Sequence, residues 1–111
     1  MELTVTHEEG YVLAVTEGPI DDSAEALFRK HLHPLVGRAG GKLVLDLSKS
    51  NFISSSGLGQ LVSLAVHANT NGSKVVLAAC SPFIAVVFQR SKLNLFLETA
   101  NSVADAARML N

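Results

Sequence analysis

Two short, almost uncharged runs of apolar residues constrain the fold more than any other feature of the sequence. Residues 42–47 are Lys-Leu-Val-Leu-Asp-Leu, and residues 74–79 are Lys-Val-Val-Leu-Ala-Ala. Strands with apolar residues at nearly every position are typical of parallel sheets, which are covered on both faces. Residues 57–71, between the two runs, have the apolar spacing of a helix. A strand, a helix and a second strand of these lengths form a right-handed crossover, which predicts a parallel sheet.

The rest of the chain supplies further strands and helices for the same sheet. In chain order, we predict strands at 3–7 and 11–16, a helix at 23–36, the strand at 42–47, the helix at 57–71, the strand at 74–79, a helix at 82–91, an edge strand at 93–97 and a helix at 103–110. Ser102, followed three residues later by Asp105, resembles a capping box for the last helix. The order ββαβαβαβα predicts an α/β fold in one domain over residues 1–111, with a mixed, mainly parallel β-sheet and helices packed on it.

Several side chains can be assigned to the inside or the outside of this fold. Phe52 and Ile53 are the apolar residues of a polar loop at 48–54, and we expect both to face inward. The helix at 57–71 has two sides by its period. The expected outward stripe comprises Gln60, Ser63 and His67, and the expected core side comprises Leu58, Leu61, Val62, Ala65, Val66 and Asn69.

The composition indicates a folded protein without a membrane span. Hydrophobic residues make up 48% of the 111 residues and charged residues 17%, which is too apolar for a disordered chain. No apolar run approaches the roughly 20 residues that cross a bilayer, and the acidic start of the chain lacks the pattern of a secretory signal. The lone cysteine, Cys80, can form no intrachain disulfide. We therefore predict a cytoplasmic protein with no membrane insertion.

Enzymatic and nucleic-acid-binding functions find little support. The basic residues are scattered over several predicted elements with no aromatic residues among them, whereas nucleic-acid binding needs a concentrated basic face. The sequence lacks a phosphate-binding GxxxxGK[ST] loop and a GxSxG nucleophile elbow. His31 and His33 point to different faces of the predicted helix and cannot bind one metal together. We predict no catalytic residues, no metal site, no cofactor and no nucleic-acid partner.

Three consecutive serines at the start of a predicted helix are the feature that best suggests a function. Ser54, Ser55 and Ser56 precede Gly57, whereas a helix cap needs only one hydroxyl. The free N–H groups and the dipole of a helix start favour negative charge. A phosphate on one of these serines would add about −1.5 to −2 charges, and the fold would tolerate it. A serine cap, a polar loop and glycines for close packing explain the same residues, so both interpretations stay open at this point.

These residues resemble the signature of the STAS domain, and in particular that of the small bacterial anti-sigma factor antagonists. The family pattern is a buried strand ending in Asp-Leu, an aromatic-apolar pair, Asp-Ser-Ser-Gly-Leu-Gly and an apolar helix. The matching residues are Asp46-Leu47, Phe52-Ile53 and Ser55-Ser56-Gly57-Leu58-Gly59. The resemblance extends along the chain, because residues 17–21 are similar to a family motif after the second strand, and residues 74–110 are similar to the later elements.

The resemblance implies a change of binding partner that is controlled by phosphorylation. Unphosphorylated members of the family bind an anti-sigma factor, often itself a serine-protein kinase, and so release a sigma factor. Phosphorylation of the serine two residues before the glycine breaks this binding, and a serine phosphatase restores it. That serine is Ser55 here, with Ser54 and Ser56 as alternative acceptors, and Ser56 is expected to cap the helix. The free protein is expected to be a monomer.

We expect the partner to bind around these serines, because the polar loop before the helix lies between two well-packed elements. The resemblance places Asp21 near Ser55, where its carboxylate would repel an incoming phosphate or orient the hydroxyl. The predicted binding residues are Asp21, Asn51, Ser54, Ser56, Gly57, Gln60, Ser63 and His67.

One residue departs from the family pattern. Ser54 occupies the position of the usual Asp, which removes a local charge available to the kinase and makes Ser54 a competing acceptor. Phosphorylation could therefore be altered or lost while partner binding survives. An alternative within the family is a STAS module of another partner-switch system without a sigma factor, such as a biofilm regulator, a stress regulator or a lipid transporter.

Overall fold

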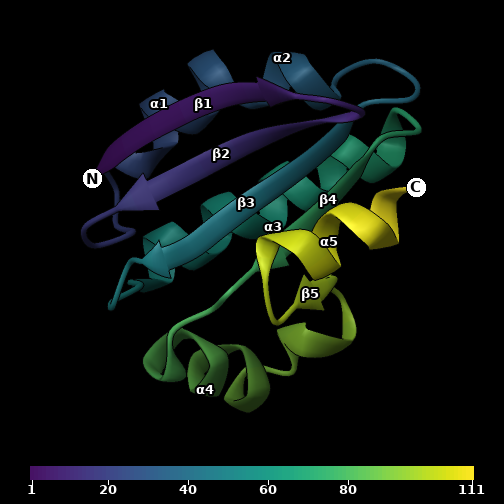
Figure 1. Cartoon of the computed structure of the whole chain (residues 1–111). Helices are drawn as coiled ribbons and strands as arrows, with labels where there is room; N and C mark the ends of the chain where they lie inside the picture. The colour runs from purple at the N-terminus through teal and green to yellow at the C-terminus, as the bar shows by residue number, and fades with distance from the viewer.

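A sheet of five strands in the spatial order β1-β2-β3-β4-β5 forms the middle of the molecule (Figure 1). The computed structural model describes residues 1–111. The strands are β1 (Glu2–Glu8), β2 (Tyr11–Glu17), β3 (Lys42–Lys49), β4 (Lys74–Ala78) and β5 (Thr99–Ala100). Only β1 and β2 are antiparallel, and every other pair of neighbours is parallel. The predicted mixed, mainly parallel sheet is confirmed.

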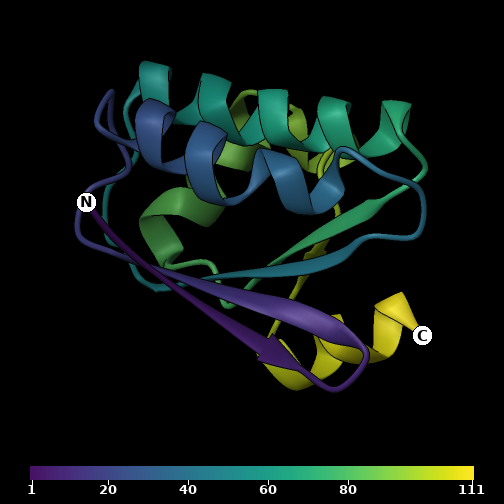
Figure 2. The same ribbon diagram turned by 90° about the horizontal axis from the view of Figure 1, so that it is seen from above.

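Helices cover both faces of this sheet. They are α1 (Ala24–His31), α2 (His33–Val36), α3 (Ser55–Thr70), α4 (Pro82–Arg90) and α5 (Val103–Leu110), with a short 3-10 helix η1 (Leu93–Leu95). Figure 2 shows α1 to α4 on one face of the sheet and α5 on the other. None of the helices is both long enough and apolar enough to span a membrane.

The strand β3 faces a core on each side. Leu43, Leu45 and Leu47 belong to the larger core under α1 to α4, whereas Val44 belongs to the smaller core under α5. Successive side chains of a strand point to opposite faces. This alternation explains why apolar residues fill β3 almost without interruption, and it confirms the prediction of a strand buried on both faces.

The predicted helix at 23–36 is broken near its end. α1 stops at His31 and α2 begins at His33, with Leu32 between them at φ −108°. Pro34 lies in the first turn of α2. Because proline lacks a backbone N–H and crowds the preceding turn, it interrupts the helix there. The prediction of one continuous helix is therefore wrong.

The fifth strand lies later in the chain than the predicted edge strand at 93–97, so that prediction is wrong as well. Lys92 turns the chain with φ 62°, and the Leu97 N–H donates back to the Leu93 carbonyl (2.7 Å). Local hydrogen bonds thus replace those of a sheet. Leu97 still reaches the core, while Leu95 is 83% exposed. The alternating apolar pattern belongs to a helical turn here, and not to a strand.

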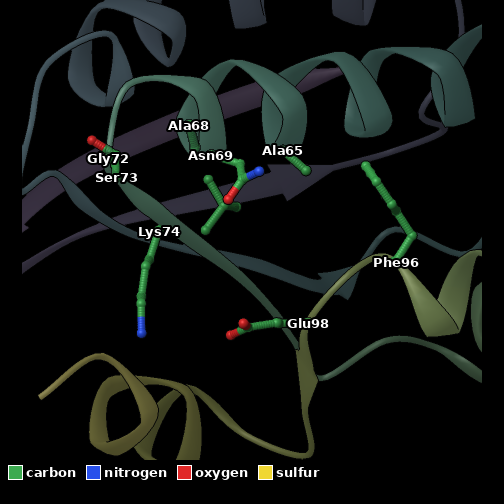
Figure 3. Close-up of a pocket in the computed structure, with 9 residues that line it drawn as sticks. Ala65, Ala68, Asn69, Gly72, Ser73, Lys74, Phe96 and Glu98 are labelled. Carbon is green, nitrogen blue, oxygen red and sulfur yellow. The ribbon is translucent and has the colours of Figure 1, made fainter.

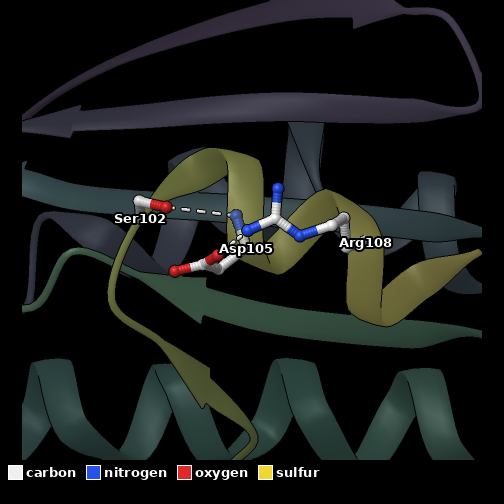
Figure 4. A network of polar contacts seen from close by, with 3 residues as sticks. All are labelled: Ser102, Asp105 and Arg108. Carbon is white, nitrogen blue, oxygen red and sulfur yellow. Dashed lines mark hydrogen bonds and ion pairs between the residues drawn. The ribbon is translucent and has the colours of Figure 1, made fainter.

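The last helix begins as predicted. The Ser102 Oγ accepts a hydrogen bond from the Asp105 N–H (3.1 Å), as Figure 4 shows. Ser102 is therefore the cap of α5. The Asp105 carboxylate pairs with the Arg108 guanidinium one turn further along. The start of α5 thus carries its own balanced pair of charges.

Some of the expectations about buried side chains need correction. Ile53 is buried as expected, but Phe52 is 48% exposed. Val66 and Asn69, which lie on the predicted core side of the helix, are exposed. The true buried side is rotated from the predicted one, because Leu64 faces the core. It comprises Gly57, Leu61, Leu64 and Ala68.

Candidate functional site

The serine cluster, defined as Ser54–Ser56, lies at the amino end of α3, and Ser54 is the cap. Ser54 has an extended backbone (φ −89°, ψ 170°), and its Oγ accepts a hydrogen bond from the Gly57 N–H (3.1 Å). A cap side chain bonds the N–H two or three residues further on. The expectation that Ser56 caps the helix is therefore wrong, because the helix begins two residues earlier than that expectation required.

Ser55 and Ser56 are the first two residues of α3, and both are exposed. The capping hydrogen bond of the cluster uses Ser54 alone. The first turn of α3 contains no acidic residue, so the partial positive charge of the helix start is not compensated there. Two exposed hydroxyls thus lie where an added anion is favoured.

The segment after β2 holds the start of α3 in place. The Ile20 N–H donates to the Phe52 carbonyl (2.9 Å), and the Ser54 N–H donates to the Ile20 carbonyl (3.0 Å). A Cβ atom on Gly57 would lie 2.0 Å from the Ile20 carbonyl oxygen, so only glycine permits this approach. Gly57 is buried. It therefore positions the serine cluster and offers little surface to a partner, in contrast to its predicted place among the binding residues.

Asp21 lies beside the serine cluster. The Ile20 carbonyl accepts a hydrogen bond from the Ser54 N–H (3.0 Å), so the backbone of Asp21, the residue after Ile20, lies next to Ser54. The Asp21 carboxylate accepts hydrogen bonds from the Oγ (2.5 Å) and the N–H (3.0 Å) of Ser23. These bonds, the side-chain one foremost, lower the pKa of Asp21 below its ordinary value. Asp21 therefore keeps a negative charge next to the start of α3.

A buried pair of hydroxyls supports the loop that carries the cluster. Thr16 and Ser50 are fully buried, and their hydroxyl oxygens lie 2.7 Å apart in a hydrogen bond. The Ser50 N–H also donates to the Leu47 carbonyl (3.1 Å), which tightens the exit from β3. Sequence reasoning missed this pair. The available signal was a threonine two residues after Ala14, which places it on the same inward face of β2.

The other predicted binding residues are spread along the loop and α3. Asn51 and Ser63 are exposed, whereas Gln60 is half-buried. His67 lies near the opposite end of α3, roughly 18 Å along the helix from the serine cluster. Its ring packs against that of His33 in α2, with 4.9 Å between the ring centroids. Asn51 is therefore close to the serines in the sequence, whereas His67 lies far from them in the structure.

An aromatic pair that sequence reasoning missed adjoins the loop before α3. Phe52 stacks on Phe83 of α4, with the ring centroids 5.6 Å apart and an angle of 24° between the ring planes. Both side chains are about half exposed, and Val86, one turn further along α4, is exposed as well. Exposed apolar side chains that gather in this way mark interaction surfaces. We call Phe52, Phe83 and Val86 the aromatic patch.

Metal-binding side chains do not converge on this site. No three His, Cys, Asp or Glu side chains are placed where they could hold a metal ion. The Cys80 thiol is partly buried, and this burial raises its pKa to about 11, so little thiolate is present at neutral pH. What the site offers is a pair of exposed hydroxyls, a helix start and an apolar patch. This chemistry suits protein binding and covalent modification.

Comparison with known proteins gives this arrangement a family. The model of the STAS domain matches residues 2–106, and the chain therefore belongs to the STAS domain family. BtrV of Bordetella bronchiseptica, which is named as an anti-sigma factor antagonist, is 27% identical to this chain over 107 residues, covering 96% of this chain and 92% of BtrV. Anti-sigma factor antagonists are thus among its homologues, at low identity.

Two solved structures show the same fold at lower identity. A Thermotoga maritima protein described as an anti-sigma factor antagonist has a TM-score of 0.87 at 16% identity, covering 97% of this chain and 93% of that one. The phosphorylated form of SpoIIAA from Bacillus has a TM-score of 0.73 at 18% identity, covering 97% of this chain and 99% of that one. These likenesses confirm the predicted α/β STAS fold.

Proposed function

We propose that this protein is an anti-sigma factor antagonist controlled by phosphorylation of Ser55. In this proposal, the unphosphorylated protein binds an anti-sigma factor that is also a serine-protein kinase, and a sigma factor is released. Phosphorylation breaks the complex, and a serine phosphatase restores the binding form. The protein acts in the cytoplasm as a binding partner, and not as an enzyme. The observation that best supports the proposal is the exposed Ser55 hydroxyl at the start of α3.

Ser55 is the best supported of the three serines. The Ser54 Oγ accepts the capping hydrogen bond, so a phosphate on Ser54 would disturb the start of the helix. Ser56 is exposed as well and remains the alternative acceptor. Ser55 combines exposure with the position that is phosphorylated in the resembling family, two residues before the glycine.

The serine in place of the family's usual Asp is compatible with this proposal. Ser and Asp are both strong caps, and Ser54 makes the capping bond that an Asp would make there. The exchange of Asp for Ser therefore retains the helix start and removes one negative charge from the surface that the kinase would recognise. We expect slower phosphorylation of Ser55, with partner binding retained.

The proposed partner surface combines the serine cluster with the aromatic patch. Apolar contacts with the aromatic patch would supply binding energy, because aromatic side chains dominate many interfaces. A phosphate on Ser55 would bring a near-dianion into this surface, close to the Asp21 carboxylate. An unpaired charge buried at an interface costs on the order of 2–5 kcal/mol, roughly 30-fold to several thousandfold in affinity. The fold accepts the same charge, because a helix start stabilises an anion by about 0.3–1 kcal/mol.

Phosphopeptide mapping with the cognate kinase tests the assignment of the acceptor. The label should be found on Ser55, and Ser55→Ala should remove it and bind the kinase constitutively. Ser56→Ala is the matched control and should still be labelled, because it changes a neighbouring exposed hydroxyl in the same helical turn. A label found mainly on Ser54 or Ser56 would contradict the assignment.

The second candidate is a STAS module of another partner-switch system without a sigma factor, and it fits the Ser54 exchange if this exchange has altered control by the kinase. A pull-down from the native cytoplasm separates the two candidates. If the protein is an antagonist, the pull-down should recover a serine kinase, and that kinase should carry no bound sigma factor. Recovery of a partner unrelated to any sigma factor would favour the second candidate.

A further inference from the structure

β5 is shorter than β4, so part of the β4 edge that faces β5 has no partner strand, whereas the other edge of β4 is paired with β3 along its whole length. β5 pairs only with Leu77 and Ala78 of β4, and the Leu77 N–H donates to the Glu98 carbonyl (2.9 Å). In a parallel ladder, alternate residues present their backbone groups to the same neighbour. The Val75 N–H and the Ser73 carbonyl therefore face the same edge as Leu77, at a place that β5 does not reach.

This open edge borders a groove of about 390 Å³ (Figure 3). Ala65 and Ala68 of α3 contribute small side chains to one wall, and Phe96, which follows η1, lies on the same side of the groove. Lys74 and Glu98 extend on the other side of the sheet edge. The remaining lining residues are Asn69, Gly72, Ser73 and Val75.

The groove exists because the chain before β5 does not continue the strand. A residue two positions before Glu98 would pair with the open edge if β5 were longer. Instead, residues 93–97 form η1 and the turn after it. The unpaired edge is thus a consequence of the same helical turn that replaced the predicted strand, and it leaves backbone donors and acceptors available to another chain.

We propose that this groove binds an extended segment of a partner protein, which adds a strand to the sheet beside β4. In a parallel register, the segment residue opposite Lys74 would donate its N–H to the Ser73 carbonyl and accept from the Val75 N–H. The residues before and after it would point toward α3, where Ala65 and Ala68 leave space for apolar side chains. The central side chain would lie between Lys74 and Glu98, which favours a polar residue. The ligand is therefore an apolar-polar-apolar segment in β conformation.

The charge at this edge argues against a second copy of the chain as the occupant. Pairing of two β4 edges would bring the two Lys74 ammonium groups close together, and like charges across a strand pair are destabilising. A lysine on an open edge also discourages pairing with identical strands. The groove lies toward the carboxyl end of α3, at Asn69 and Gly72, and the serine cluster lies at the amino end. This inference therefore stands independently of the proposed function.

Amide hydrogen exchange and an NMR titration test the proposal with a designed probe, the peptide acetyl-Thr-Val-Ser-Val-Thr-amide. In the free protein, the Val75 N–H should exchange faster than the Leu77 N–H. Addition of the peptide at millimolar concentration should slow the exchange of Val75 and shift its resonance. A control peptide with an N-methyl group on the central serine has no donor for the Ser73 carbonyl. It should bind about tenfold more weakly, the equivalent of one hydrogen bond.

Two variants of the protein test the location. Ala65→Leu should fill the groove and weaken binding of the peptide about tenfold. Val66→Leu is the matched control, because Val66 is exposed on α3 outside the groove lining, and it should bind like the wild type. Equal binding of the two peptides, no change at Val75, or shifts confined to β1 would overturn the proposal. Protection of Val75 that rises with protein concentration without peptide would also overturn it, because a second copy would then be the occupant.

Discussion

The helices α3 and α5 both begin with a serine cap. In each helix, the cap Oγ accepts a hydrogen bond of 3.1 Å from a backbone N–H of the first turn. The first turn of α5 balances its own charge, because Asp105 faces the helix start and pairs with Arg108. The first turn of α3 has no acidic residue, and Ser55 is exposed there. A serine cap therefore does not by itself mark a functional site. The unbalanced helix start and the available hydroxyl distinguish α3.

The largest difference between the two helix starts is expected in partner binding. Ser55→Asp should weaken binding to the proposed anti-sigma factor partner roughly 30-fold or more, because the added carboxylate would be left unpaired in the proposed binding surface. Ala104→Asp adds the same charge to the first turn of α5, on the other face of the sheet, and should bind like the wild type. Isothermal titration calorimetry measures both affinities. Equal losses in the two variants would show that the two helix starts do not differ in partner binding.

The next effect concerns how firmly each helix start is held by the rest of the molecule. Gly57→Ala should lower the free energy of unfolding by about 3 kcal/mol, because the new Cβ would overlap the Ile20 carbonyl and displace α3. Gly59→Ala is the control, since a Cβ at Gly59 meets nothing within 4 Å. That variant should gain up to about 1 kcal/mol from helix propensity. Urea denaturation gives both values, and an unchanged stability of Gly57→Ala would contradict the close contact.

Removal of the caps should affect the two helices alike. Ser54→Ala and Ser102→Ala should each cost about 1 kcal/mol of stability, because each leaves one N–H of the first turn without its partner. Ser54→Asp should stay close to the wild type, since Asp caps as well as Ser does. Thermal unfolding followed by circular dichroism measures these differences. A loss at Ser102 with none at Ser54 would show that the contacts of Ile20 hold α3 without its cap.

The smallest effect is expected at the contact between His33 of α2 and His67 of α3, and it tests whether this contact serves only the fold. Burial lowers the pKa of His33 from 6.5, with His67 and Arg29 adding to the shift. The folded protein then takes up this proton less readily than the unfolded chain. The stability contributed by the neutral ring is therefore present above about pH 6.5 and is lost as the pH falls through the lower folded pKa.

Because His33 is only partly buried, the loss should be small. His33→Gln should flatten the dependence of Tm on pH between about pH 6.5 and the lower pKa of His33 in the folded protein. It should leave partner binding at neutral pH unchanged. Thermal unfolding over a series of pH values measures the first effect, and calorimetry the second. A loss of binding in His33→Gln would extend the proposed partner surface to the contact between His33 and His67.

The sequence predicts the parts of this fold in which local pattern and burial agree. β3 and β4 were predictable because their side chains are apolar on both faces, and Ser102 was predictable because one serine precedes a helix there. At residues 54–56, three serines have equal capping preference. The contacts of Ser54 and Gly57 with Ile20, more than thirty residues away in the chain, favour a helix start at Ser54. That information is not contained in a local pattern.

Two other features could not be predicted for related reasons. Hydrophobicity placed Phe52 inside, but the ring packs on Phe83 at the surface, and these residues come from separate elements. The alternating apolar residues at 93–97 fit a strand equally well as a helical turn. The turn at Lys92 and the hydrogen bond from the Leu97 N–H to the Leu93 carbonyl favour the helical turn.

The close approach of Gly57 to Ile20 also bears on how proteins with this fold can diverge. The contact is made by backbone atoms, so it holds the start of α3 whatever side chains surround it. Asn51, Ser55 and Ser56 are exposed around this fixed point and can be exchanged without moving the helix. New partner preferences can thus arise through single substitutions, and duplicated copies within one cell can be insulated from one another by a few surface side chains, with the scaffold unchanged.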